Sequence, residues 1–259
     1  MLKQINSTVL FIGMFMLPLL VHGQSDTTEA ALEKLRTQSG VDPTRVSSRM
    51  GYSFLYYDQS DDKSQINNRI SMNIGVNRWS FSLKPEFGTI QSGVPGEGFK
   101  TGFNDLKFSV LNAFYVKGKH ALAGSVEFGL PTGTVGFSTQ YFTATPAITY
   151  SHTIKPSLIF AIQPQYTFAL AKDPLYPDIS VITIRSFIAN FNTSGWFFVF
   201  EPRPIIDLEN DEFDLILSPI VGKSLGAGFN LIFLSEIPTK QETIDSRGIL
   251  YQFGFNKNF

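Results

Sequence analysis

Ionisable side chains recur between apolar ones in several long segments of this sequence. In a β-strand, successive side chains point to opposite faces, so this spacing would gather the charges on one face and the apolar residues on the other. Inside a closed sheet, such a face could screen solutes as a charged pore lining, or could fill the interior with mutually neutralising groups. Both interpretations stay open. The candidates for this lining are Arg69, Lys84, Glu86, Lys107, Glu127, Arg185, Glu201, Arg203 and Asp214.

The other motifs that could carry chemistry are incomplete. The chain has no cysteine, which excludes disulfides and thiol catalysis. The "GKS" at 222–224 lacks the earlier glycine of a phosphate loop, and the acidic stretch 207–214 lacks the turn glycine and the final glutamate of a calcium loop. We therefore assign no catalytic, cofactor-binding or metal-binding residue and expect no cofactor. A formal charge of −1 gives no electrostatic basis for binding nucleic acid.

The elements that must position the charges are twelve alternating segments. Most are about twice as long as an average strand of about 5 or 6 residues, and they suit a tilted membrane-spanning strand, which needs about 9 to 11. Long polar connections alternate with tight ones, which is typical of an outer-membrane barrel with outer loops and periplasmic turns. The segments are centred on 49–57, 66–77, 79–90, 103–115, 120–130, 140–151, 157–169, 179–190, 195–205, 212–222, 226–236 and 247–259.

The composition indicates that lipid faces much of the surface. The chain has 25 Phe and 9 Tyr but only 17% charged residues, against about 25% in a typical soluble protein. In the last segment, Tyr251, Phe253, Phe255 and Phe259 share one parity, and we predict that this aromatic face contacts lipid. Residues near segment ends would form the interfacial aromatic belts, namely Tyr56, Tyr57, Trp79, Phe114, Tyr115, Tyr150 and Trp196.

Several prolines conflict locally with this strand pattern. Proline cannot donate to the hydrogen-bond ladder, so within a sheet it is usually found at an edge or a bulge. We interpret these positions as bulges in the barrel wall. The prolines concerned are Pro85, Pro146, Pro164, Pro202 and Pro219.

The N-terminal part of the chain divides into two segments before the barrel. Residues 1–23 have a positive start at Lys3, an apolar run and small residues before Gln24, which predicts a secretory signal peptide. Residues 24–48 are polar and include a short helical pattern ended by Gly40 and Pro43, so they form either a periplasmic tail or a plug. Residues 49–259 form the barrel, whose even strand number places both termini in the periplasm.

Three stretches together resemble a known family of outer-membrane proteins. They are "GFNDLKFSVLNAFY", "EFGLPTGT" and "ATPAITYSHTIKPSLIFAIQPQYTF", within residues 99–170. This region is similar to the MetA-pathway phenol-degradation family, which implies a barrel that acts as a transporter or channel, associated in some relatives with uptake of aromatic compounds. The final segment resembles the C-terminal signal of bacterial outer-membrane proteins, which implies the barrel-assembly machinery as a partner.

These observations predict an all-β protein: a single up-and-down antiparallel transmembrane barrel of about twelve strands in the outer membrane of a Gram-negative bacterium. We predict a channel or transporter for passive passage of small solutes, aromatic or hydrophobic ones among them, with outer-membrane lipid and lipopolysaccharide as its surroundings. Two alternatives remain. One is a lipid-modifying enzyme, although its only histidines after signal removal, His120 and His152, lie beside short turns and hence away from the outer leaflet. The other is a structural or adhesive barrel that conducts nothing.

Overall fold

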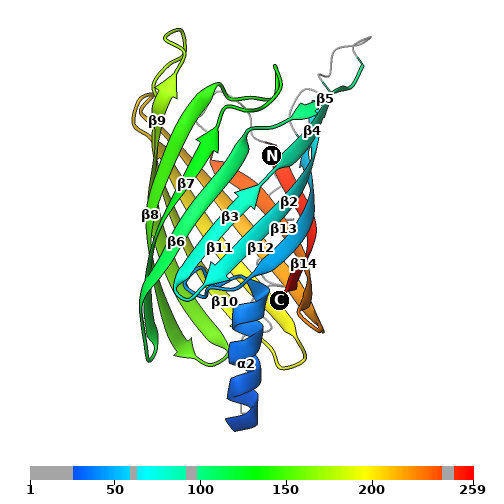
Figure 1. Ribbon diagram of the computed structural model, residues 1–259, viewed down its shortest axis with the longest axis vertical. Helices are drawn as coiled ribbons and strands as arrows, with labels where there is room; N and C mark the ends of the chain where they lie inside the picture. Colours follow the sequence, from blue (N-terminus) through cyan, green and yellow to red (C-terminus); the bar gives the residue numbers. More distant parts are fainter. Residues whose placement is uncertain (1–25, 59–62, 92–97, 241–247) are drawn as a thin grey trace, which may run out of the picture.

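The computed structural model describes residues 26–58, 63–91, 98–240 and 248–259. Within these ranges, the chain forms a closed antiparallel barrel with a single helix before the first strand (Figure 1). The predicted fold class is therefore confirmed. The predicted signal peptide, residues 1–23, lies outside the described residues.

Fourteen strands make up the wall, because two of the twelve predicted segments are each divided in two. β14 pairs with β1, and β1 also pairs with β2, so the sheet closes into a barrel, in which, among the described strands, only the short β5 pairs with a strand on one side alone. The strands are β1 (Arg49–Asp58), β2 (Ser64–Val76), β3 (Trp79–Lys84), β4 (Glu86–Gln91), β5 (Lys100–Phe103), β6 (Leu106–Lys117), β7 (His120–Leu130), β8 (Tyr141–Lys155), β9 (Leu158–Lys172), β10 (Ser180–Phe191), β11 (Trp196–Asp207), β12 (Glu212–Gly226), β13 (Phe229–Lys240) and β14 (Ile249–Asn258).

The bulge interpretation is wrong for four of the five prolines. Pro146, Pro164, Pro202 and Pro219 each face a register partner without a shift, as in the pairs Ile184↔Pro164 and Phe200↔Pro219. A proline removes one ladder hydrogen bond on one side only, and the pairs before and after it hold the register of a long strand. Register shifts occur elsewhere, for example between Asn112 and Tyr115.

Pro85 does lie at a break, the one that separates β3 from β4. β3 and β4 pair with β2 in one uninterrupted register, since the pair Met72↔Leu83 before Pro85 and the pair Arg69↔Glu86 after it belong to the same alignment. On the other side, Lys84 pairs with Lys107 and Phe87 with Phe103, so the partner strand has one extra residue. This extra residue falls at 104–105, between β5 and β6, and forms a bulge in the wall.

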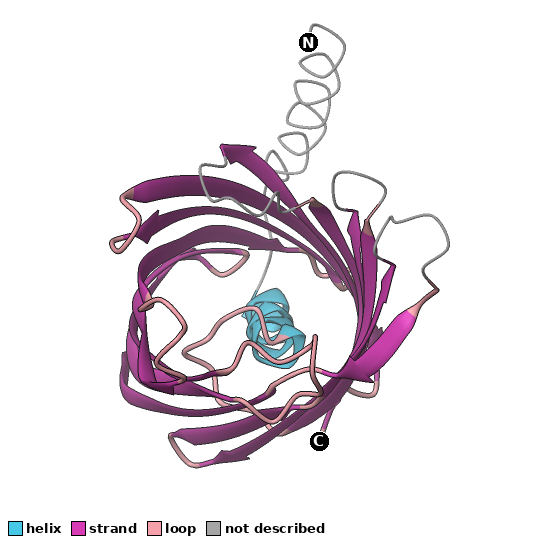
Figure 2. Ribbon diagram, turned by 90° about the horizontal axis from the view of Figure 1, so that it is seen from above, coloured by secondary structure: helices cyan, strands magenta, loops and turns pink. Residues whose placement is uncertain are grey.

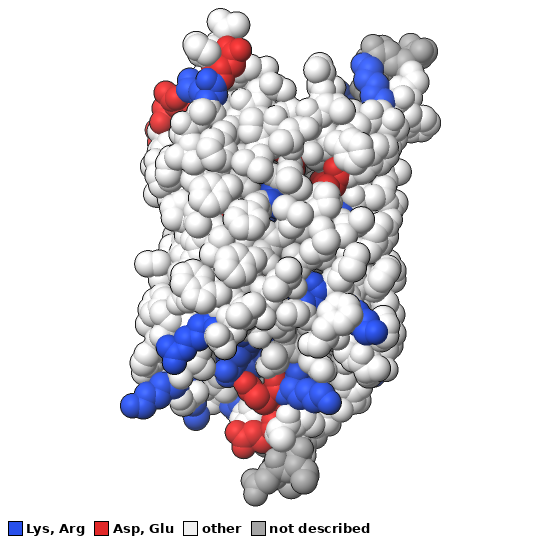
Figure 3. Space-filling model, in the orientation of Figure 1, with Lys and Arg blue, Asp and Glu red and all other residues white. Residues whose placement is uncertain are grey.

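The exposed face of the wall is apolar and aromatic, as predicted. Phe253 and Phe255 on β14 are exposed, whereas the intervening Gly254 is buried. Charged atoms gather near the two ends of the face that Figure 3 shows, and the band between them is mostly uncharged. One assignment to the interfacial belts is wrong: Tyr57 shares the parity of buried Leu55 and interacts with Arg69. Adjacent strand residues point to opposite faces, so Tyr56 and Tyr57 cannot both face outward.

The helix α2 (Asp26–Ser39) lies at one end of the barrel, within the outline of the wall when viewed along the axis (Figures 1 and 2). We call this the α2 end and the opposite one the loop end. The strand connections at the α2 end are tight, and Asn77 and Gly118 in two of them have φ values of 55° and 58°, typical of two-residue hairpin turns. None of the helices in the described ranges is long and apolar enough to span a lipid bilayer.

Candidate functional site

The predicted charges on the first strands form ion pairs across the wall. Arg69 on β2 pairs with Glu86 on β4, which lies directly opposite it in the register. Lys84 on β3 reaches Glu127 on β7, with 2.7 Å between Nζ and Oε2. Lys107 on β6 lies opposite Lys84 and is exposed. The structure therefore brings these predicted residues together on one part of the wall.

A second group joins β10, β11 and β13 through a buried carboxylate. Glu201 is only 2% exposed and accepts two hydrogen bonds from Arg185, at 2.7 Å from Nε and 3.0 Å from Nη2. Arg203 Nε donates to the same carboxylate at 3.0 Å, and its Nη1 donates to Glu236 at 2.7 Å. Such charge-assisted, partly bidentate contacts satisfy a carboxylate that is shielded from water. The predicted Asp214 on β12 is also buried.

Two further residues extend these groups along the wall. Tyr57 on β1 interacts with Arg69 of the first group and with Glu236 of the second. On the other side, Arg185 Nη1 reaches Gln163 Oε1 on β9 at 3.4 Å. We use the name charged belt for Arg69, Lys84, Glu86, Glu127, Arg185, Glu201, Arg203 and Glu236.

The sequence pattern singles out neither Glu236 nor Tyr57. Glu236 stands at the very end of a predicted segment, where parity is easily lost, and Tyr57 looks like an interfacial aromatic. Parity along β13 could have identified Glu236 as an interior residue. Glu236 lies an even number of positions from buried Asn230 and an odd number from exposed Phe233. Pairing across strands, which sets the partner of each charge, is not encoded in any local pattern.

At the loop end, the connection between β7 and β8, residues 131–140, folds back over β4 and β5. A Cβ atom at Gly102 would lie 2.0 Å from Thr134 Oγ1 and 2.6 Å from the Phe137 ring. Gly88, the register partner of Gly102, has Phe137 Cδ1 within 3.0 Å of the corresponding position. The two glycines therefore leave the space in which Phe137 packs against the wall, close to Asn104.

Asp105 fastens this connection to the bulge between β5 and β6. Its carboxylate, nearly buried, accepts hydrogen bonds from Gly133 N at 2.9 Å, Thr139 N at 2.7 Å and Thr139 Oγ1 at 2.6 Å. Thr134 N also donates to Phe103 O at 2.9 Å. Two of the stretches quoted for the family resemblance, "GFND" and "LPTGT", thus contact one another at the loop end.

We expect Asp105→Asn to loosen residues 131–140 without unfolding the barrel. The amide keeps the shape of the carboxylate but carries no charge to strengthen the hydrogen bonds that it accepts. The free energy needed to open residues 131–140 locally should therefore fall by about 2 kcal/mol. Hydrogen exchange of the Thr139 amide should then be faster by about 30-fold. Asp173→Asn is the matched control, because Asp173 bonds within its own connection, to Leu175 N. Equal exchange at Thr139 in both variants would contradict the assignment.

At the α2 end, the apolar face of the helix packs on the inner face of the wall. Leu32 and Leu35 are buried against an apolar cluster, whereas Glu33 and Lys34 on the opposite side are exposed. The cluster on the strands consists of Ile159, Ala161, Phe187, Ala189, Phe191, Phe197 and Val199. Since α2 lies within the outline of the barrel, these residues face the interior, and so do Arg185, Glu201 and Arg203, which share their strand parity (Figure 2). The cross-strand register places the rest of the charged belt on the same face.

The helix ends at Ser39, and the next residue, Gly40, has a φ of 71°, a left-handed conformation that favours glycine. A buried ion pair then fixes the chain after the helix. Arg36 Nε donates to Asp42 Oδ2 at 2.6 Å, and Arg36 also donates to Thr153 on β8. Asp42 Oδ1 accepts from Thr44 N at 2.9 Å. Residues 36–44 are therefore tied to the wall by groups that are shielded from water.

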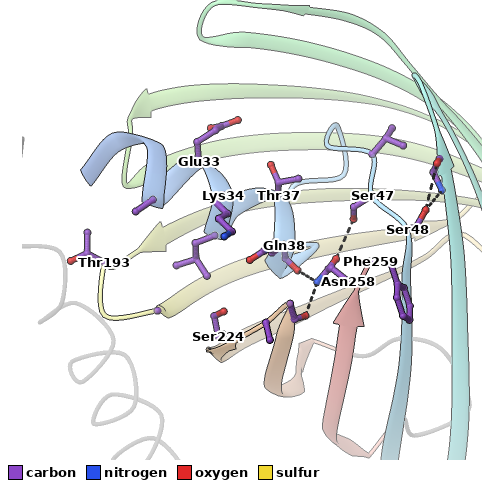
Figure 4. A pocket seen from close by; sticks show the side chains of 18 of the residues that line it. Glu33, Lys34, Thr37, Gln38, Ser47, Ser48, Thr193, Ser224, Asn258 and Phe259 are labelled. Atoms are coloured by element: carbon purple, nitrogen blue, oxygen red, sulfur yellow. Dashed lines mark hydrogen bonds between the residues drawn. The ribbon is translucent and has the colours of Figure 1, made fainter. Parts of the chain in front are cut away.

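A pocket of about 990 Å³ remains beside the helix at this end (Figure 4). It is lined by α2, by the tight turns 192–195 and 224–228, and by the C-terminal residues. Gln38 O accepts hydrogen bonds from Asn258 at 2.6 Å and Asn230 at 3.0 Å, which closes one side of the pocket. The helix thus occupies part of the opening and leaves a polar gap next to it.

His120 and His152 lie on the exposed face of the wall, near the α2 end. His120 Nδ1 contacts Tyr150 OH at 2.8 Å and His152 Nδ1 at 3.4 Å. Among the described residues, no serine is hydrogen-bonded to either ring. This arrangement offers no nucleophile and base pair of the kind that the alternative of a lipid-modifying enzyme requires.

Comparison with solved structures finds the same fold in outer-membrane channels. The outer-membrane channel from Pseudomonas putida F1 has a TM-score of 0.66 and 9% identity, over 83% of this chain and 96% of its own. The NanC porin has a TM-score of 0.62 and 14% identity, over 81% and 100%. The KdgM porin has a TM-score of 0.58 and 10% identity, over 82% and 99%. At these identities, the likeness establishes a porin-like barrel fold.

Sequence comparisons add no closer relationship. No protein-family model matches the chain, and no curated protein gives a significant match. Membership in the MetA-pathway phenol-degradation family therefore stays a prediction.

Proposed function

We propose that this protein is an outer-membrane channel for passive passage of small solutes. The observation that carries the proposal is a closed barrel with an apolar exterior and a belt of charged side chains around its interior. An exterior of this kind is unfavourable in water and suited to acyl chains. The porin-like fold supports the same conclusion. We further propose that the barrel crosses the outer membrane with its α2 end and both termini on the periplasmic side.

In this proposal, the charged belt lines the solute route and sets its selectivity, together with Lys107 and Asp214. Lumen charges of both signs, held in fixed pairs, create a local field that favours some solutes over others without a net charge. Twelve wall segments, counting each divided one once, give an interior between the filled eight-stranded barrels and the open sixteen-stranded porins. Side chains that extend from the belt therefore have a large effect on the free cross-section.

The two ends of the barrel restrict the route further. At the loop end, residues 131–140 carry Phe137 over β4 and β5, and at the α2 end the helix packs against an apolar cluster that includes Phe187 and Phe197. We propose that α2 acts as a plug, with the adjacent pocket as the remaining opening. The resemblance to the phenol-degradation family favours small aromatic or hydrophobic solutes.

Liposome swelling with the purified barrel tests this function. We expect proteoliposomes to swell in small solutes such as arabinose or phenol derivatives faster than protein-free liposomes, with a rate that falls steeply as solute size increases. Bound α2 should keep the absolute rate low. Absence of flux for every small solute, in a preparation whose barrel is folded, would refute the channel and favour a structural barrel.

A further inference from the structure

A row of basic residues crosses the exposed face of the wall at the α2 end. Lys117 on β6 is the register partner of His120 on β7, and His120 is the register partner of His152 on β8. Lys119 in the β6–β7 turn and Lys155 at the end of β8 flank this row. The basic face, as we call these five residues, is therefore continuous over three strands.

In the part of the chain that the structure describes, no acidic side chain forms an ion pair with the basic face. Between 106 and 172 the sequence contains a single acidic residue, Glu127, which belongs to the charged belt inside the barrel. Within the described part of the chain, Lys117, Lys119 and Lys155 form no ion pair. Lysines elsewhere do have partners, since Lys172 pairs with Asp178 and Lys223 lies over the Trp196 ring. The lower part of the face that Figure 3 shows carries both Lys or Arg and Asp or Glu side chains.

Apolar and aromatic side chains continue directly from the basic face toward the middle of the barrel. The next cross-strand row consists of Tyr115, Leu122 and Tyr150, and Tyr150 OH contacts His120. Beyond it, Phe114 and Ile148 are exposed, at 48% and 59%. The order along the strands is thus cationic, then amphipathic, then apolar, which is the order of chemical groups in a phospholipid from headgroup to acyl chain.

We propose that the basic face binds the phosphate group of an anionic phospholipid whose acyl chains lie along Phe114, Leu122 and Ile148. The inference rests on the proposed membrane location, and it assigns the lipid to the leaflet at the α2 end. The lysine ammonium groups supply the charge, and the imidazole of His152, at the β8 end of the row, supplies a hydrogen-bond donor. Unpaired cations at the edge of a low-dielectric layer gain more from such an anion than cations in water do.

Two double variants test the proposal on the full mature protein in detergent micelles. Lys117→Gln with Lys155→Gln removes two charges from the basic face, whereas Lys223→Gln with Lys257→Gln removes two charges that lie over aromatic rings at the same end. Titration with phosphatidylglycerol or phosphatidylcholine, followed by native mass spectrometry, counts the bound lipid. Since each lysine near an anionic headgroup contributes about fivefold to binding, we expect about a 25-fold loss of phosphatidylglycerol affinity in the first variant.

The control variant should lose less than about fivefold, and phosphatidylcholine binding should change little in either. Equal affinity of the wild type for the two lipids would overturn the proposal, as would equal losses in both variants. Heat-modifiable migration in gels confirms that each barrel is folded. The lipid-binding measurement does not depend on solute flux. A barrel that binds phosphatidylglycerol selectively but conducts no solute would therefore contradict the proposed channel function and leave the lipid site in place.

Discussion

Leu32→Asp combined with Leu35→Asp should raise the single-channel conductance of the reconstituted barrel several-fold. Both leucines are buried between α2 and the apolar cluster on β9, β10 and β11. Two carboxylates placed there would lose several kcal/mol of hydration with no partner to compensate them, so the helix should leave the wall while the barrel persists. Planar-bilayer recordings in potassium chloride give the conductance directly. The wild type should show the smaller value because its helix occupies the α2 end.

Thr28→Asp combined with Ala30→Asp is the matched control, because neither residue is buried and neither lines the pocket beside the helix. It adds the same two carboxylates without burying them, and the conductance should stay close to that of the wild type. Deletion of residues 24–48 should reproduce the leucine variant. If the deletion leaves the conductance unchanged, α2 is a tail beside the opening and does not act as a plug.

Glu201→Gln should destabilise the barrel and shift its ion selectivity toward anions. The substitution keeps the shape of the side chain but removes the charge that Arg185 and Arg203 share. Loss of one partner from a buried ion pair costs about 3 to 5 kcal/mol. Arg185 is 38% exposed and can be hydrated in part, so we expect a value near the lower limit. The urea midpoint of refolding into lipid reports the stability.

The selectivity follows from the same change, since two guanidinium groups would keep their charge beside a neutral amide. The reversal potential in a potassium chloride gradient should move toward the chloride value. Glu209→Gln is the control, because Glu209 lies in the exposed turn between β11 and β12. If Glu201→Gln changes neither the midpoint nor the reversal potential, the belt is not part of the conducting route and does not stabilise the wall.

The prediction of the strands succeeded because each one carries a local signal. Alternation of apolar and polar residues persists over a whole membrane-spanning strand, so one residue that is unfavourable in a strand, such as Pro164, does not hide the pattern. The divided strands were less predictable. The break at Pro85 and the extra residue at 104–105 depend on how β3 and β4 pair with β5 and β6, which is a property of two segments at once.

The candidate residues of the belt were predictable one by one, but their partners were not. Parity identified Arg185, Glu201 and Arg203 as one face of their strands, yet only the register places Glu236 against Arg203. Asp105, between β5 and β6, contacts residues 133 and 139 in the connection between β7 and β8. No sequence period extends over such a separation, because the contact depends on the closed shape of the wall.

The sequence by itself determined the fold class, the number of wall segments and the common face of predicted charges such as Arg185, Glu201 and Arg203, because these follow from a period of two residues and from the length of each segment. Only the tertiary structure decided which charges pair, how residues 131–140 fold back, and that α2 packs against the inner face of the wall at one end of the barrel. The physical reason is that closure of the barrel fixes the register of every strand at once. Side chains from distant segments then meet at positions that no local preference specifies.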